Sequence, residues 1–172
     1  MTLEIKTADE LADAVLEARW TARRADRRDD VFQRILRTFI EREGPVAVSE
    51  IGEAFPDRAH GAMFDAVARL DEKDLIVVRE GRVEFAYPFA GVPTPFAVIL
   101  RGGRRRYACC AIDALGVAAM LRERIDIRSR CHDCREPLGF SVDEAGPARD
   151  ARGIMVWVGK RDEGARRLCT SL

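Results

Sequence analysis

Long apolar runs, a net charge and a secretion signal are all missing from this chain of 172 residues. No uncharged apolar stretch approaches the roughly 18 residues that span a bilayer. The start, MTLEIKTADELADAV, lacks the basic residues and apolar core that mark a signal peptide. Lys plus Arg and Asp plus Glu both number 29, so the overall charge favours neither a nucleic-acid coat nor an acidic tail. We therefore expect a cytoplasmic protein that makes no membrane contact.

Cysteine is absent from the first 108 residues, and histidine occurs only twice in the whole chain. The five cysteines are Cys109, Cys110, Cys131, Cys134 and Cys169. An odd number of cysteines without a secretion signal argues against a disulfide framework and favours reduced thiols that bind metal or react. We therefore expect the chemistry of the protein to lie beyond residue 100.

The first half of the chain has the pattern of helices followed by a hairpin. Apolar residues at helical spacing predict four helices. The first covers residues 8–28, and the second is capped by Asp29 or Asp30 and ended by Gly44-Pro45. The third is short and begins at Ser49, and the fourth covers residues 59–74. Residues 75–80 and 82–88 are predicted to be strands joined by a turn at Glu80-Gly81. This order is typical of a winged helix-turn-helix domain, which we place at residues 1–89.

The second half has the pattern of a small sheet domain. Residues 90–95, rich in Pro and Gly, are predicted to be a linker. Beyond it the sequence predicts strands at 96–102, 104–110, 125–131, 138–143 and 153–159, and a helix at 112–123. The fold class is therefore α+β, with a mixed-sheet domain at residues 96–172.

The densest group of chemically active residues lies where a predicted strand meets a predicted helix. One helical turn brings Cys110 and Asp113 together. A helix N-terminus favours the thiolate, which is both a nucleophile and a soft-metal ligand. Asp113 would then relay or donate a proton, provided that burial keeps part of it protonated. The same residues also fit a structural role, with Asp113 facing the helix dipole and Cys110 packed as a small apolar residue.

Cys131 and Cys134 form a CxxC pair, which is half of a zinc site. A structural zinc needs four ligands, and no second CxxC or HxxxH motif is present. A redox pair, a thiol relay for a soft metal and plain structural cysteines all remain open.

Cys169 follows two arginines, Arg166 and Arg167, which favour a thiolate. Together with Cys110 it would offer two thiolates to one linear soft cation such as Hg(II) or Cu(I).

The run from Tyr107 to Cys131, YACCAIDALGVAAMLRERIDIRSRC, resembles the catalytic core of the organomercurial (alkylmercury) lyases. That core has a Tyr-Ala-x-Cys-Ala-Leu-Asp motif, a helix of small and apolar residues, and a strand that ends in cysteine. The spacing from Cys110 to Cys131 is also similar. In that family a winged-helix-like N-terminal domain precedes the sheet domain, which is the order predicted here.

The resemblance implies a role for each cysteine of the motif. Cys110 and Cys169 would bind mercury as thiolates, Asp113 would assist proton delivery to the departing carbanion, and Cys131 would be a buried structural cysteine. The implied reaction is protonolysis of an organomercurial to a hydrocarbon and Hg(II), with no organic cofactor. The Hg(II) would pass to cellular thiols or a mercuric reductase.

The chain departs from the family in three places. Cys109 stands where a bulky residue is usual, which makes it a further candidate metal ligand, and Cys134 adds the CxxC pair. Family members also continue further beyond the last cysteine, so the implied activity could be weak or lost.

Two other functions compete with the lyase. A DNA-binding regulator that senses thiophilic metals through its cysteines is suggested by a basic cluster: Arg19, Arg23, Arg24, Arg27 and Arg28. We expect this cluster to pair with Asp26, Asp29 and Asp30, and the helix at 59–74 is too acidic for a DNA reader. A structural zinc protein would need Cys131, Cys134 and two more ligands.

Overall fold

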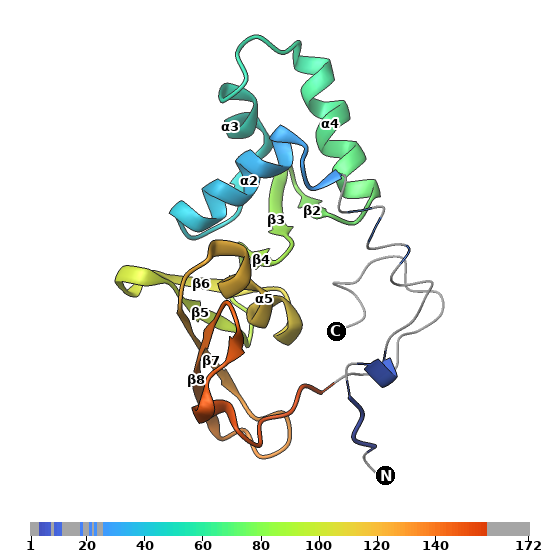
Figure 1. Ribbon diagram of the computed structural model, residues 1–172. Helices are drawn as coiled ribbons and strands as arrows, with labels where there is room; N and C mark the ends of the chain where they lie inside the picture. The colour runs from blue at the N-terminus through green and yellow to red at the C-terminus, as the bar shows by residue number, and fades with distance from the viewer. Residues whose placement is uncertain are drawn as a thin grey trace.

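The computed structural model describes residues 4–7, 9–11, 18, 21, 23 and 26–157. Figure 1 shows helices gathered at one end and a sheet that extends from them, with a further helix packed on the far part of the sheet. The elements, in chain order, are η1 (Asp9–Leu11), α2 (Asp30–Glu41), β1 (Val46–Ala47), α3 (Val48–Glu53), α4 (His60–Glu72), β2 (Ile76–Arg79), β3 (Arg82–Ala86), β4 (Phe89–Ala90), β5 (Ala97–Ile99), η2 (Arg101–Gly103), β6 (Arg105–Ala108), α5 (Ala111–Leu121), β7 (Ile125–Arg130), β8 (Pro137–Asp143), β9 (Gly146–Pro147) and η3 (Arg149–Ala151). The described residues therefore form an α+β fold, as predicted.

Helix α2 has the cap and the apolar face that the sequence predicts. The Asp29 carboxylate accepts hydrogen bonds from the backbone N–H groups of Val31 and Phe32 and so satisfies two free donors of the first turn. The inner face is fully buried and consists of Val31, Phe32, Ile35, Leu36 and Phe39. The chain then turns at Gly44, whose φ of 96° favours glycine.

Of the remaining predictions for the first half, one differs in detail and one is confirmed. Helix α3 begins at Val48, and its N-cap is Ala47 rather than Ser49, because β1 pairs with β3 and leads directly into the helix. The β2–β3 hairpin turns at Glu80 and Gly81, both with positive φ, as the two-residue turn requires.

One antiparallel sheet extends through both halves of the chain. Its strand order is β1-β3-β4-β6-β5-β7-β8-β9, and β2 also pairs with β3. The link is β4, because Ala90 pairs with Phe85 of β3 while Phe89 pairs with Ala108 of β6. Ala90, the first residue of the predicted linker, is thus a strand residue, and the domain division at 90–95 stays a prediction.

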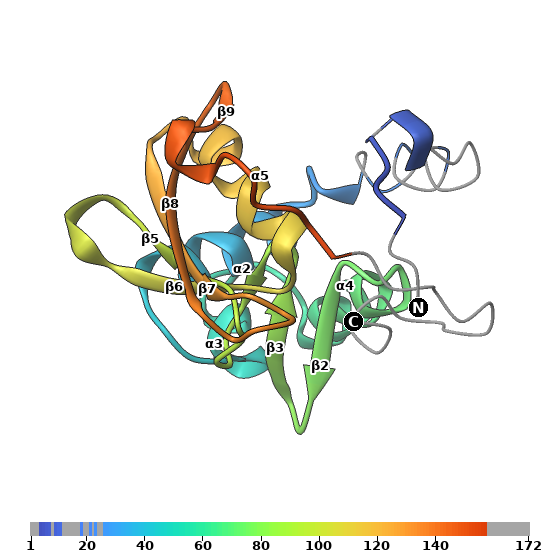
Figure 2. The same cartoon turned by 90° about the horizontal axis from the view of Figure 1, so that it is seen from below.

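Helix α5 covers the sheet in the second half. It contacts β6, β7, β8 and β9, and both views place it over these strands (Figures 1 and 2). Its buried face consists of the small residues Ala114, Val117 and Ala118, which let the helix approach the sheet closely. These side chains share one apolar core with Phe39 and Leu70 from the first half.

The strand predicted at 153–159 is wrong where the structure describes it, at 153–157. Gly153 lies in a turn, and Met155, Val156 and Trp157 are exposed and unpaired with the sheet. The short strand β9, which the sequence does not predict, pairs with the end of β8 at Val142 and Asp143. Most of the helix predicted at 8–28 lies outside the described residues. Within the described ranges, no helix is long and apolar enough to cross a bilayer.

Candidate active site

The end of β6 and the start of α5 bring a thiol and a carboxyl into contact. Cys110 is the N-cap of α5, in an extended backbone conformation with φ −148° and ψ 179°. Its sulfur accepts a hydrogen bond from the Asp113 backbone N–H at 3.3 Å. The Cys110 thiol donates to Asp113 Oδ2 at 3.0 Å. The structure thus brings together two of the three residues that the sequence assigns to catalysis.

The Cys110 thiol is held in its protonated form. Burial, and next the negative charge of Asp113, raise its pKa from 9.0 to about 12. The backbone N–H groups of the helix start act in the opposite direction, but their effect is smaller. The lowered pKa that the helix N-terminus led us to expect is therefore wrong for this thiol.

Asp113 has a raised pKa as well, because it is buried. The hydrogen bond from Cys110 and the positive charge of Arg27 oppose this rise. Arg27 belongs to the basic cluster that the sequence assigned to the surface. Its electrostatic effect on Asp113 could not be predicted from the sequence, because no local pattern links segments so far apart in the chain.

The side chain of Cys109 lies in a different environment from that of Cys110. It is 8% exposed, and its thiol donates to the Phe89 carbonyl of β4 at 3.1 Å. It packs in a small cluster with Tyr87 and Ala90. Because successive side chains of an extended segment point to opposite sides, Cys109 faces β4 while Cys110 faces the start of α5.

Cys131 and Cys134 lie in the turn between β7 and β8. Cys131 is half-buried and Cys134 exposed, so Cys131 is not the buried cysteine that the resemblance implies. Hydrogen bonds from the backbone N–H groups of Cys134 and Asp133, and from the Cys134 thiol, lower the pKa of Cys131. The ring of His132 stacks on Trp157, with centroids 5.2 Å apart.

Neither a zinc centre nor the dithiolate can be built from what the structure describes. Within the described ranges, no group of three or more His, Cys, Asp or Glu side chains is placed to hold a metal ion. Cys169, with Arg166 and Arg167, lies outside those ranges. Its approach to Cys110 stays a prediction.

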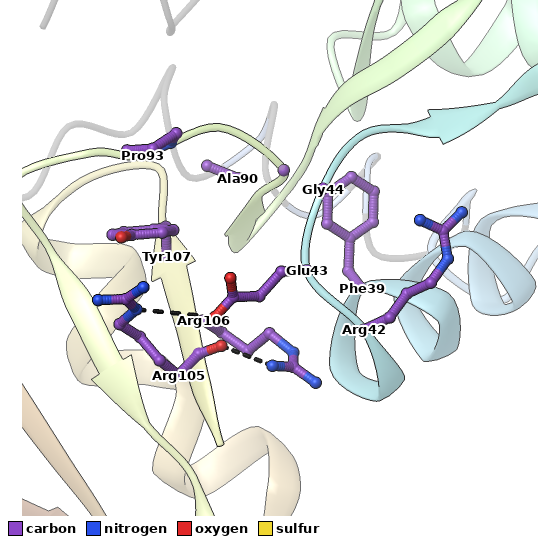
Figure 3. Close-up of a pocket in the computed structure, with 10 residues that line it drawn as sticks. Phe39, Arg42, Glu43, Gly44, Ala90, Pro93, Arg105, Arg106 and Tyr107 are labelled. Atoms are coloured by element: carbon purple, nitrogen blue, oxygen red, sulfur yellow. Dashed lines mark hydrogen bonds and ion pairs between the residues drawn. The ribbon is translucent and has the colours of Figure 1, made fainter. Parts of the chain in front are cut away.

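A cavity of about 290 Å³ lies elsewhere, between the end of α2 and β6. Figure 3 shows Phe39 and Arg42 on its α2 side, opposite Arg105, Arg106 and Tyr107 of β6. Neither Cys110 nor Asp113 lines it. The cavity therefore belongs to the junction of the two halves rather than to the thiol–carboxyl pair.

Arg106 holds that junction together from the sheet side. It is 7% exposed, and its Nε and Nη2 donate to the Ile40 carbonyl at 3.0 and 2.6 Å. Arg104 adds a third hydrogen bond to the same carbonyl. A cation at this position also complements the C-terminal end of the α2 dipole.

Comparison with known proteins finds a family model that matches the second half and a solved structure that is similar to the chain. Residues 89–172 match the family model of the alkylmercury lyases. Among solved structures, the chain is similar to the mercury-bound form of MerB2, with 28% identity and a TM-score of 0.51. The match covers 61% of this chain and 50% of that one, so the chain spans about half the length of MerB2. No curated protein matches. The resemblance to this family seen in the sequence is confirmed.

Proposed function

We propose, on the premise that residues 89–172 form an alkylmercury lyase domain, that the protein cleaves carbon–mercury bonds by protonolysis. An organomercury cation and a proton would give a hydrocarbon and Hg(II). The observation that carries this proposal is the 3.0 Å hydrogen bond from the Cys110 thiol to Asp113 Oδ2. A soft-metal ligand and an acid–base group in direct contact are the two parts that protonolysis needs.

The proton for the departing carbon would come from Cys110 itself. When mercury binds the Cys110 sulfur, the thiol proton moves along the existing hydrogen bond to Asp113. The raised pKa of Asp113 favours the protonated carboxyl. Asp113 then donates this proton to the carbon as the carbon–mercury bond breaks, and it becomes a carboxylate again. The pair thus holds the proton in place beside the reacting bond.

A second thiolate would complete the mercury site. The family resemblance assigns this role to Cys169. Two thiolates raise the electron density on mercury and weaken its bond to carbon. The Hg(II) product would then leave to thiols, either free cellular thiols or those of a mercuric reductase. The cytoplasmic location expected from the sequence stays a prediction.

Headspace measurement of benzene from phenylmercuric acetate, in excess free thiol, tests the proposal. We expect Asp113→Asn to lower the rate by about 10²–10⁴-fold, the usual range for loss of a general acid. Cys110→Ser should abolish turnover. Asp65→Asn, which changes an exposed carboxylate of α4, is the matched control and should behave like the wild type. Benzene release that is unaffected by both site variants would rule the mechanism out.

The DNA-binding alternative finds less support in the described residues. In a winged helix, α4 would be the helix that reads DNA. Basic side chains on and beside α4 form three ion pairs: Arg58–Asp30, Arg69–Asp29 and Lys73–Asp26. The sequence predicts that these aspartates pair with the N-terminal arginines, of which Arg19 and Arg24 lie outside the described residues, so that pairing stays a prediction. Cations engaged in this way are poorly available to phosphates. We therefore propose that the N-terminal half is a winged-helix-like unit with a packing role.

A further inference from the structure

The CxxC turn is not explained by the structure of the core. Cys131 and Cys134 are absent from both apolar clusters, and Cys134 is exposed. Backbone hydrogen bonds close the turn, from Cys131 N to the Glu136 carbonyl and from Arg135 N to the Cys131 carbonyl, and Arg130 Nη1 donates to the Arg135 carbonyl. The Cys134 thiol hydrogen-bonds to the Cys131 sulfur. The Cys131 sulfur also accepts hydrogen bonds from the backbone of the turn, and the exposed Cys134 thiol lies beside it, so that neither thiol is part of the core.

The sheet register places this turn at the same end as the thiol–carboxyl pair. Tyr107 of β6 pairs with Ala97 of β5, and Ala97 pairs with Arg128 of β7. Strands β6 and β7 therefore run in the same direction on either side of β5. Cys110 comes three positions after Tyr107, and Cys131 comes three positions after Arg128.

Two strand spacings separate β6 from β7, which is roughly 10 Å. Figures 1 and 2 both show the start of α5 and the turn between β7 and β8 at this end of the sheet. A metal ion that leaves Cys110 at this end of the sheet would therefore have a short path to the turn that carries Cys131 and Cys134.

We propose that Cys131 and Cys134 form a second thiol site that accepts Hg(II) released at Cys110. The pair suits a soft cation of linear geometry, because two sulfur ligands complete its coordination. Structural zinc needs four ligands, and the described ranges contain no cluster of three or more donors. His132, the nitrogen donor of the turn, has its ring stacked on Trp157.

The transfer is a ligand exchange without oxidation or reduction. Two Hg–S bonds break, one to Cys110 and one to the second thiolate of the active site, and two form, to Cys131 and Cys134. The protons lost by the two accepting thiols are taken up by the two thiolates that leave the metal. This site rests on the proposed lyase function for its supply of Hg(II), but its capacity to bind Hg(II) can be measured separately.

The binding test uses mercuric chloride and a variant that cannot act as a lyase. With Cys110 and Cys169 both changed to Ser, we expect the protein to retain one Hg(II) against competing glutathione, as seen by native mass spectrometry. A further Cys134→Ser change should weaken retention by more than the roughly 100-fold that loss of an outer-shell partner costs. Asp133→Asn, in the same turn, is the control and should retain the ion. No retained mercury, or a Cys131–Cys134 disulfide in its place, would overturn the site.

The transfer test uses the otherwise wild-type protein and phenylmercuric acetate at limiting free thiol. Cys134→Ser should leave the first-turnover burst of benzene unchanged and lower the steady-state rate by about tenfold, since product release becomes slower. Excess free thiol should restore the rate. A normal steady state in Cys134→Ser would refute the acceptor role and leave the proposed lyase standing. Absence of benzene from every protein would refute the lyase, whether or not the turn binds Hg(II).

Discussion

At the scale of single residues, Cys110 differs from most reactive cysteines because it keeps its proton. Its spacing to Asp113 is visible in the sequence, since residues i and i+3 meet on one helical turn. Whether the pKa of Cys110 is raised or lowered cannot be seen in the sequence, because burial of the thiol depends on how β6 and α5 pack. Burial is the largest cause of the rise to about 12, and the helix N-terminus does not outweigh it.

This raised pKa makes the stability of the protein sensitive to alkali. In the folded state the Cys110 thiol titrates at about 12 rather than 9.0. The folded protein therefore holds more protons than the unfolded chain between these values, and its free energy of unfolding falls as the pH rises through them. We expect the free energy of unfolding of Cys110→Ser to fall less steeply as the pH rises. Urea unfolding at several pH values, followed by circular dichroism, measures this. Parallel curves for the two proteins would contradict the assignment.

Cys109 provides the matching test of which neighbouring thiol binds metal. Its sulfur is buried and donates to the Phe89 carbonyl, so it is occupied in packing. We expect Cys109→Ala to lower the free energy of unfolding by about 1–2 kcal/mol while benzene release continues. Cys110→Ala should abolish benzene release, and it should also lower the free energy of unfolding by about 1 kcal/mol, because the N-cap of α5 is lost. Loss of activity in a folded Cys109→Ala protein would show that Cys109 shares the metal.

At the scale of secondary structure, the long elements could be predicted and the shortest could not. The face of α2 has a clear helical period, and β7 and β8 have a clear alternation. Strands β1, β4 and β9 have only two residues each, too few to show any period. Residues 153–157 have strand-like composition, but they follow β9 and η3 and pair with no strand of the described residues. Their exposure could not be read from composition alone.

The contact between α2 and β6 depends on one buried arginine. Three neighbouring arginines suggest a solvated strand, yet Arg106 is buried and donates twice to the Ile40 carbonyl. We expect Arg106→Met to cost about 1.5–3 kcal/mol of unfolding free energy, as for hydrogen bonds from a charged group. Arg105→Met, on the exposed side of the same strand, should change it by less than about 0.5 kcal/mol. Thermal unfolding of both variants measures these two changes. Equal losses of unfolding free energy would refute the role given to Arg106.

At the scale of the whole molecule, Gly91 fixes how closely the two halves approach. A Cβ at this position would lie 2.8 Å from Phe39 Cε1 and 2.9 Å from the Pro45 Cα. The backbone of the turn after α2 cannot yield cheaply, so we expect Gly91→Ala to destabilise the protein by about 1–3 kcal/mol.

Gly116 is the control for this change. Nothing lies within 4 Å of a Cβ at Gly116, on the exposed side of α5. Gly116→Ala should therefore stabilise the protein by up to about 1 kcal/mol, through helix propensity. Chemical denaturation measures both variants. A Gly91→Ala protein as stable as the wild type would show that the halves can separate without cost.

The order of the two halves could be predicted from the sequence, but their continuity could not. Helices, hairpin and sheet follow one another as expected. The two-residue strand β4 lies at the start of a Pro- and Gly-rich segment that is typical of a linker. Only its pairing on both sides, with β3 and with β6, makes it part of the sheet.

A protonated Cys110 also determines which reagents the resting protein withstands. Peroxides and carbon electrophiles attack the thiolate, which is scarce when the pKa is near 12. A soft cation binds sulfur strongly enough to displace the proton, and Asp113 is placed to take it. The thiol should therefore resist sulfenic acid formation and alkylation during oxidative stress while still capturing mercury. An ordinary low-pKa cysteine would be consumed by the same conditions before any organomercurial arrived.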